Sequence, residues 1–291
     1  MNRTSRDAGA VRYAFSTLGV PGMPVPEVLR LAVDAGYQGV ELRAHPEEPV
    51  HPGTSTAERA AVRGQFADAG ITALAVAGYA RVAEQQDAAG ERELADRLRE
   101  LVELAADLGA PFVRVFPGGG ERPAADADAD AARRLAALAP FAAGRGVRVL
   151  LETHDSHRTG AAAARVLGLV GHRSVGALWD VLHTRLGGEE PAASHAALAP
   201  YLGYVQVKDV VSAEDPTPVP LGAGTLPLAD CLAALGSGTG TVDATVEEAG
   251  AGRWLCWEYE KRWYPQAAPL PGLLAAGRRH LQELPAARPA P

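Results

Sequence analysis

Residues 146–154 read GVRVLLETH, a short apolar run that begins at a glycine and ends in three polar side chains. The run is too short for a helix and rich in valine and leucine, so it predicts a buried strand over residues 147–152. Three later runs have the same form, an apolar strand with acidic or amide side chains at its carboxyl end. They read VGALWD at 175–180, YVQVKD at 204–209 and WLCWEYE at 254–260. The repetition predicts neighbouring strands whose polar carboxyl ends meet on one side of the protein.

The first half of the chain carries four more strand-like runs, and helical stretches separate successive runs. The additional strand-like runs are residues 11–16, 39–43, 72–77 and 112–116. The helical stretches are residues 26–35, 56–69, 92–108, 126–144, 160–170, 192–198 and 228–235. Strands that alternate with helices are typical of an α/β protein with a parallel sheet, and eight strands close a (β/α)8, or TIM, barrel. We therefore predict a single barrel domain over residues 10–284, with tails at 1–9 and 285–291.

The composition limits the kinds of partner. The chain of 291 residues has a net charge of -7, and its Lys and Arg residues are scattered. Nucleic-acid binding relies on clustered cations, so we expect no nucleic acid partner. No apolar run approaches the roughly 18 residues that cross a bilayer, and the N-terminus lacks the pattern of a secretory signal, so we expect a cytoplasmic protein that does not bind membranes. Cys231 and Cys256 form no CxxC or Cys/His cluster, which favours a packing role for both.

Each polar strand end offers one inward-pointing oxygen ligand, because strand residues alternate between two faces. These candidate metal ligands are Glu152, Asp180, Gln206 and Glu258. Three carboxylates at one barrel mouth would repel one another, and a bound cation removes that cost. Oxygen donors favour Mg²⁺ or Mn²⁺, while Zn²⁺ and Co²⁺ stay open. Taken singly, Glu152 or Asp180 could cap a helix or pair with an arginine, but the set of four predicts one divalent ion.

Other polar side chains near these strand ends are candidates for binding a substrate. His154 and His183 follow ligand candidates at offsets of two and three, and a structural role is the alternative for each. Lys208 lies two residues past Gln206 and can hold a substrate oxygen or phosphate, or form a salt bridge with Glu260. The predicted substrate-binding residues are His154, His183, Lys208, Glu260, Arg43 and Arg114, and Glu41 shares the inward face of its strand with Arg43.

The second half of the chain contains five motifs at informative spacing. They are LETH at 151–154, WDVLH at 179–183, VQVKD at 205–209, PLGAGTLP at 220–227 and WEYEKRWYP at 257–265. These motifs resemble the xylose isomerase-like barrels, which include sugar phosphate isomerases and epimerases. The resemblance implies metal ligation by Glu152, Asp180, Gln206 and Glu258, with His183 and His154 near the substrate. Many members carry histidine where this chain has Gln206, although the hydroxypyruvate isomerase branch is similar to it in using glutamine, and an amide oxygen there favours Mg²⁺ or Mn²⁺.

The resemblance also implies a reaction, that of a divalent-metal-dependent sugar or sugar phosphate isomerase or epimerase. The metal would hold a small carbohydrate or polyol-derived substrate, while Glu152 and Glu258 move a proton through an enediolate. If the enediolate expels a β-hydroxyl, the enzyme is instead a dehydratase acting on an inosose or dehydroshikimate-like substrate. A non-catalytic sugar-binding barrel is a third alternative, and a homo-oligomer stays open. The resemblance extends to endonuclease IV, but the early strand ends offer Tyr79 and Pro117 rather than a set of histidines, which disfavours a nuclease.

Overall fold

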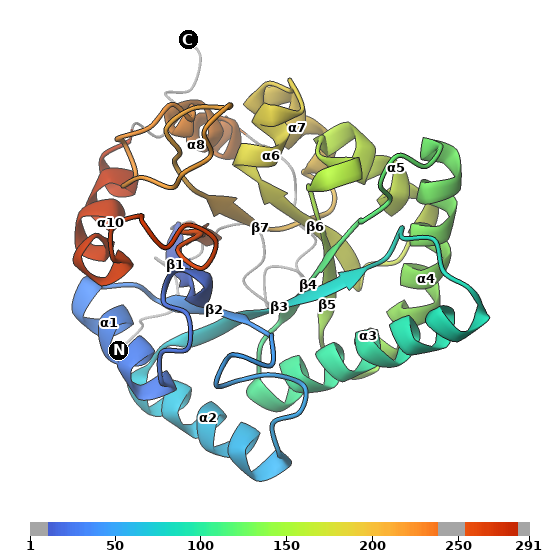
Figure 1. The fold of residues 1–291 in the computed structure, drawn as a ribbon, viewed down its shortest axis with the longest axis horizontal. Helices are drawn as coiled ribbons and strands as arrows, with labels where there is room; N and C mark the ends of the chain where they lie inside the picture. The colour runs from blue at the N-terminus through green and yellow to red at the C-terminus, as the bar shows by residue number, and fades with distance from the viewer. Residues whose placement is uncertain (1–10, 238–253, 285–291) are drawn as a thin grey trace, which may run out of the picture.

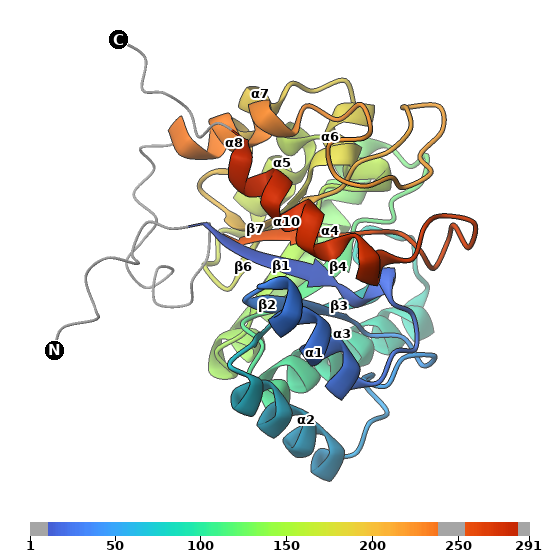
Figure 2. The same ribbon diagram turned by 90° about the vertical axis from the view of Figure 1, so that its left-hand side faces the viewer.

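The computed structural model describes residues 11–237 and 254–284, and these form one closed barrel of eight parallel strands (Figures 1 and 2). The strands are β1 (Arg12–Ser16), β2 (Gly39–Arg43), β3 (Thr72–Arg81), β4 (Phe112–Phe116), β5 (Arg148–Glu152), β6 (Val175–Asp180), β7 (Leu202–Val207) and β8 (Trp254–Trp257). Each strand pairs with its neighbour along the chain, and β8 pairs with β1 to close the barrel. The predicted fold class is confirmed. The predicted tails lie outside the described residues.

Helices surround the strands in a ring (Figure 1). They are α1 (Val25–Ala35), α2 (Thr56–Ala69), α3 (Ala88–Leu108), α4 (Ala124–Gly144), α5 (Gly160–Val170), α6 (Val181–Leu186), α7 (Pro191–Leu198), α8 (Leu228–Ser237) and α10 (Leu274–Glu283). Short 3-10 helices occur at Thr17–Gly19, Asp155–His157 and Leu270–Gly272. The sequence patterns did not predict α6 or α10. Helix α6 has only six residues, which are too few to show a helical period. Helix α10 packs beside α1 in the ring.

Local signals explain where several helices begin and end. Ser55 accepts the Glu58 N–H, and the Glu58 carboxylate accepts the Ser55 N–H, so the two residues form a capping box at the start of α2. Helices α1 and α2 both end at a glycine in the left-handed region, with φ of 75° at Gly36 and 65° at Gly70. Most L-residues are strained in that conformation, which is why glycine marks the turn from a helix into the next strand.

Two of the later strands end earlier than their apolar runs predicted. Strand β7 covers Leu202–Val207 instead of 204–209, and β8 stops at Trp257 instead of continuing to residue 260. After β7 the Asp209 carboxylate accepts the N–H groups of Gly222 and Gly224, so the chain turns into a loop held by this side chain. The Asp209 side chain therefore links the VQVKD and PLGAGTLP motifs. Strand β3 ends later than predicted, at Arg81 instead of residue 77.

Apolar side chains fill the inside of the barrel. They are Ala14, Leu74, Ala75, Phe112, Leu150, Leu178, Tyr204, Trp254 and Cys256. This layer contains the residues two positions before the four predicted ligands, so the inward face of each later strand changes from apolar to polar as it approaches the carboxyl end. Cys231 and Cys256 are both buried and free, as the predicted packing role requires. Within the described ranges, every helix is too short or too polar to span a bilayer.

Candidate active site at the mouth of the barrel

The four predicted metal ligands lie at the carboxyl ends of β5 to β8, where Asp180, Gln206 and Glu258 are neighbours and Glu152 lies with His154 and His183. The strand register places Asp180 opposite Gln206 and places Glu152 opposite Leu178, two residues before Asp180. Glu258 follows the last residue of β8 and its Oε1 accepts a hydrogen bond of 3.1 Å from Gln206 Nε2. All four side chains are buried. The mouth therefore concentrates three carboxyl groups and one amide in a space that is largely closed to water.

The two carboxylate oxygens of Asp180 have different roles: one caps a helix and the other faces this site. Oδ1 accepts hydrogen bonds of 2.8 Å and 3.2 Å from the N–H groups of Leu182 and His183, and so caps α6. Oδ2 lies 2.7 Å from Lys208 Nζ. The helix-cap role considered from the sequence is thus present on one oxygen, and it fixes the direction in which the other oxygen points.

Lys208 lies among the carboxylates. Its Nζ contacts Glu258 Oε2 and lies 2.9 Å from Glu260 Oε1, in addition to its contact with Asp180. The predicted salt bridge to Glu260 is present, and the two further contacts were not predicted. Burial lowers the pKa of Lys208, but Asp180, Glu258 and Glu260 outweigh burial and hold the pKa well above its ordinary value. The amine is therefore charged and neutralises part of the acidic set.

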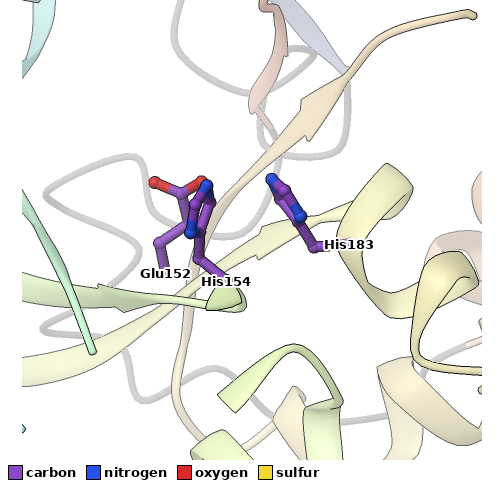
Figure 3. Close-up of side chains that lie close together, drawn as sticks. All are labelled: Glu152, His154 and His183. Atoms are coloured by element: carbon purple, nitrogen blue, oxygen red, sulfur yellow. The ribbon is translucent and has the colours of Figure 1, made fainter. Parts of the chain in front are cut away.

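Glu152 and the two predicted histidines form the other side of the mouth. Each of Glu152, His154 and His183 offers one ligand atom, and these atoms all lie within 4.8 Å of one another. Figure 3 shows the three side chains close together, with His154 just after β5 and His183 on α6. The two imidazole rings are 3.9 Å apart between centroids. Burial lowers the pKa of His183 to about 3, so this ring is neutral near pH 7 and can accept a hydrogen bond or bind a metal.

Arg114 connects Glu152 to the aromatic wall of the mouth. Its Nε lies 3.2 Å from Glu152 Oε2, and its guanidinium stacks over the Phe116 ring at 4.0 Å. Burial raises the pKa of Glu152 well above its ordinary range; Glu258 and Asp180 add to this, and Arg114 and Lys208 oppose it. Arg114 Nε and Nη1 are buried and donate no hydrogen bond within the described part of the chain. The site therefore holds a cationic donor that a ligand can use.

Arg43 is the last residue of β2, and its side chain is buried. Its Nη1 donates to Glu48 Oε1 at 2.6 Å, and its Nε donates to the Tyr79 hydroxyl at 2.7 Å. The Tyr79 ring lies between Arg43 and Arg114, with guanidinium carbons 5.3 Å and 5.6 Å from its centroid. The Arg43 guanidinium carbon also lies 5.5 Å from the ring centroid of the half-exposed Trp263. The structure thus pairs Arg43 with the buried Glu48, whereas the other five predicted substrate-binding residues lie beside Glu152 or in contact within the Lys208 cluster.

Glu41 is part of this site, as its inward-facing position made it a candidate, although it was not among the predicted metal ligands or substrate-binding residues. It is fully buried, and it accepts hydrogen bonds from the Tyr204 hydroxyl and from Gln206 Nε2. Burial raises the pKa of Glu41, with a further contribution from Glu258. Alternation along β2 indicated that Glu41 points inward. Its contact with β7 could not be predicted, because the two strands meet only across the interior of the closed barrel.

The residues present fit a divalent cation. Gln206 Oε1 and Glu152 Oε2 are buried oxygens that accept no hydrogen bond within the described residues. Buried polar atoms without partners are uncommon in proteins and call for an explanation such as an ion. Three carboxyl groups and one amide oxygen suit a hard cation, and the nearby imidazoles widen the choice to Zn²⁺. An ion bound by all four predicted ligands would share Asp180 and Glu258 with Lys208.

A closed (β/α)8 barrel with buried acidic residues at the carboxyl ends of its strands defines the general class of this protein. The sequence profile of the xylose isomerase-like TIM barrel family matches residues 29–284, and the chain therefore belongs to that family. The predicted resemblance is confirmed at this level. A comparison with curated proteins gave no significant match.

Several solved structures share the fold. The IOLI protein with a bound zinc atom is 18% identical, with a TM-score of 0.73 over 94% of this chain and 99% of its own. D-psicose 3-epimerase with D-tagatose from Clostridium cellulolyticum H10 is 13% identical, with a TM-score of 0.74 over 94% and 99%. A probable 3-DHS dehydratase from Bacillus anthracis is 18% identical, with a TM-score of 0.70 over 94% and 99%. At these identities the comparisons establish the shared fold.

Proposed function

We propose that this protein is a metal-dependent sugar isomerase or epimerase that moves a proton next to a substrate carbonyl. The observation that carries the proposal is the buried set of Glu152, Asp180, Gln206 and Glu258 at the carboxyl ends of four neighbouring strands. TIM barrel enzymes place their catalytic groups at that end. The similarity to D-psicose 3-epimerase supports a small carbohydrate as the substrate class.

We propose that the same four residues hold one divalent ion, with Mg²⁺ or Mn²⁺ favoured by the oxygen ligands and Zn²⁺ or Co²⁺ as alternatives. When bound there, the cation supplies Lewis-acid stabilisation of the negative charge that develops on the substrate oxygens. Two oxygens support this ligand set: Gln206 Oε1, and Glu152 Oε2, which forms an ion pair with Arg114; neither accepts a hydrogen bond within the described residues.

Glu152 is the proposed base and Glu258 its partner. The ionised Glu152 carboxylate takes the proton from the carbon next to the carbonyl, and the electron pair of the C–H bond forms the enediolate. Glu258 in its protonated form then gives its proton to the opposite face of that carbon, which gives epimerisation, and solvent afterwards returns a proton to Glu258 and removes the one on Glu152. Delivery of the Glu258 proton to the adjacent carbon gives isomerisation when the hydroxyl proton of the enediolate moves to the neighbouring oxygen. Burial raises the pKa of Glu152, and a base whose pKa approaches the working pH transfers protons efficiently.

The remaining polar side chains position the substrate. His154, His183 and Arg114 present donors and acceptors beside Glu152, and Lys208 and Glu260 do the same beside Glu258. Because these groups are held by contacts with one another before a substrate arrives, little ordering is required on binding. Arg43, at the carboxyl end of β2 and paired with Glu48, would contact a part of the substrate away from the reacting carbon.

A dehydratase is the second candidate, because two buried cations face the mouth. After the same proton abstraction, the enediolate expels a β-hydroxyl, which leaves as water when His154 supplies a proton. Arg114 and Lys208 would stabilise an anionic group on a dehydroshikimate-like substrate. The similarity to a probable 3-DHS dehydratase supports keeping this candidate.

Metal binding is tested first. The purified protein is stripped with EDTA and titrated with Mn²⁺, and we expect about one ion per chain. The Asp180→Asn/Glu258→Gln variant keeps the shape of both side chains and an oxygen to cap α6, and we expect it to bind essentially none. Glu190→Gln, at a strongly exposed carboxylate, is the matched control and should bind like the parent. A parent that binds no Mn²⁺ would contradict the metal proposal and favour a non-catalytic sugar-binding barrel.

The reaction is tested with the Mn²⁺-loaded protein in D₂O. Ketoses, their phosphates and inososes are screened for deuterium at the carbon next to the carbonyl, which reports proton abstraction for both candidates. Products of unchanged mass apart from deuterium indicate an isomerase or epimerase, whereas loss of water and an enone absorbance indicate a dehydratase. Glu152→Gln should lower exchange by roughly a thousandfold. Exchange that continues at the parental rate in this variant would exclude Glu152 as the base.

A further inference from the structure

Gln206 has a defined orientation in the mouth of the barrel. Its Nε2 lies 3.0 Å and 3.2 Å from the two oxygens of Glu41 and 3.1 Å from Glu258 Oε1. An NH₂ group has two hydrogens, which are enough to donate to two carboxyl groups, and an amide oxygen at that position would face three oxygens with none to donate. The nitrogen is therefore fixed on the side of Glu41 and Glu258, and the amide oxygen faces the other way.

The other end of the amide is unused by the protein. Gln206 Oε1 is buried and accepts no hydrogen bond from the described residues. If the amide rotated by half a turn, Oε1 would meet the carboxylates and Nε2 would face the space in which the cation is proposed to bind. A nitrogen of that kind is a donor and has no lone pair available for a cation, so the orientation of the amide decides whether Gln206 is a ligand.

Glu258 alone holds the amide weakly, because it is itself a proposed ligand and contacts Lys208 as well. Glu41 is not a proposed ligand, and the described partners of Lys208 are Asp180, Glu258 and Glu260. It comes from β2 across the barrel, and the Tyr204 hydroxyl holds it in place. The acceptor that fixes Gln206 therefore stays on the protein side of the amide whether or not an ion is present.

We infer that Glu41 is a positioning residue that orients the Gln206 amide so that its oxygen, and not its nitrogen, faces the metal site. This inference rests on the proposed function, because it assigns a role toward the proposed cation. Outer residues that orient metal ligands typically affect metal affinity by about 10- to 100-fold. Glu41 would do the same for an amide ligand, which has a donor end and an acceptor end and so depends on orientation.

The test measures Mn²⁺ affinity by electron paramagnetic resonance on EDTA-stripped protein. Glu41→Leu should weaken binding by about 10- to 100-fold, and the double variant with Gln206→Leu should bind no more weakly than Gln206→Leu alone. Glu41→Gln keeps an oxygen that accepts from Gln206 and removes the charge, so it should stay within about threefold of the parent, a factor worth under 1 kcal/mol. Leu150→Met, in the apolar layer of the barrel interior, is the matched control for disturbance of the interior and should bind Mn²⁺ like the parent.

Two results would overturn the inference. Additive effects of Glu41→Leu and Gln206→Leu would show that Glu41 acts independently of Gln206, and equal losses in Glu41→Gln and Glu41→Leu would show that only its charge matters. A second measurement does not need a metal. In protein labelled with ¹⁵N-glutamine, the side-chain NH₂ of Gln206, identified by its loss in Gln206→Leu, should exchange slowly with solvent and faster in Glu41→Leu. Rapid exchange in the parent would contradict the fixed orientation, whereas absence of Mn²⁺ binding with slow exchange would refute only the proposed function.

Discussion

The same strands build two levels inside the barrel, and these levels differ in polarity and in the interactions that stabilise them. The lower level is apolar and contains Leu150 and Leu178, whereas the upper level, two residues further along the same strands, contains Glu152 and Asp180. The side chains of both levels are buried and point into the barrel. The lower level is stabilised by packing that needs no partner outside the barrel, and the upper level keeps buried charges that only partly compensate one another.

The difference shows how this fold separates stability from chemistry. Burying an aliphatic side chain stabilises a protein by about 1.5–3 kcal/mol, while burying charged groups costs free energy unless each has a partner. In the upper level Lys208 and Arg114 are the cations that offset several carboxyl groups. A remaining excess of negative charge is a disadvantage for folding, and it is also the property that would bind a cation.

The largest expected effect on stability comes from removing the positive charge of Lys208 in the upper level. Lys208→Met should destabilise the metal-free protein by about 4 kcal/mol, because Asp180 and Glu258 would remain buried without their partner. The free energy of unfolding in urea with EDTA measures this change. If a divalent ion replaces the lost charge, saturating Mn²⁺ should recover a larger part of the stability in this variant than it adds to the parent.

Lys208→Arg is the control for that experiment, since it keeps the positive charge and should lose less than half as much stability. A Lys208→Met variant as stable as the parent would show that the carboxylates are neutral without their partner, and that the two levels differ less in charge than the structure indicates.

An intermediate effect is expected from the lower level. Leu150→Ala should reduce the free energy of unfolding by about 3 kcal/mol, because Leu150 is fully buried in the packed interior. Mn²⁺ affinity should remain within about threefold of the parent, since packing below the ligands does not touch their oxygens. Leu150→Met, of similar volume, should cost less than about 1.5 kcal/mol. Weakening of Mn²⁺ binding in proportion to the lost stability would show that the two levels are not separable.

The smallest effect comes from an ion cluster on the outside of the barrel, between α3 and α4. Hydrogen bonds from Arg134 and Arg133 lower the pKa of Glu91 to about 2. A carboxylate with a lowered pKa stabilises the fold at pH values above its unfolded pKa, and this contribution is lost as the pH falls through the folded value. Glu91→Gln should therefore be less stable than the parent by under about 1 kcal/mol near pH 6, and the gap should close between about pH 4.5 and pH 2.

Urea unfolding of both proteins across this pH range checks the prediction, with Glu93→Gln at a neighbouring exposed position as the control. A gap that is constant with pH would mean that the Glu91 interactions do not depend on its charge. A gap that closes with falling pH would instead sharpen the contrast with the mouth, because the partly exposed Glu91 is reached by water as it titrates, whereas the carboxylates of the mouth are buried.

Much of the barrel could be predicted because its signals are local. The periods of the strands and helices lie within short segments, and bounds such as 39–43 and 56–69 coincide with β2 and α2. The short α6 was missed because six residues show no period. The ends of β7 and β8 were misplaced because the predicted runs included the polar residues 208–209 and 258–260, which follow the last residues of the two strands.

The candidate site divides in the same way between sequence and structure. The sequence determined which side chains point inward at the ends of β5 to β8, since alternation along a strand needs no knowledge of its neighbours. Only the tertiary structure decided what they contact: closure of the barrel brings Glu41 of β2 to Gln206 of β7, and the loop after β7 places Lys208 among carboxylates from two other strands. Contacts across the barrel depend on register and closure, which arise from pairings far apart in the chain, and no local pattern of residues encodes them.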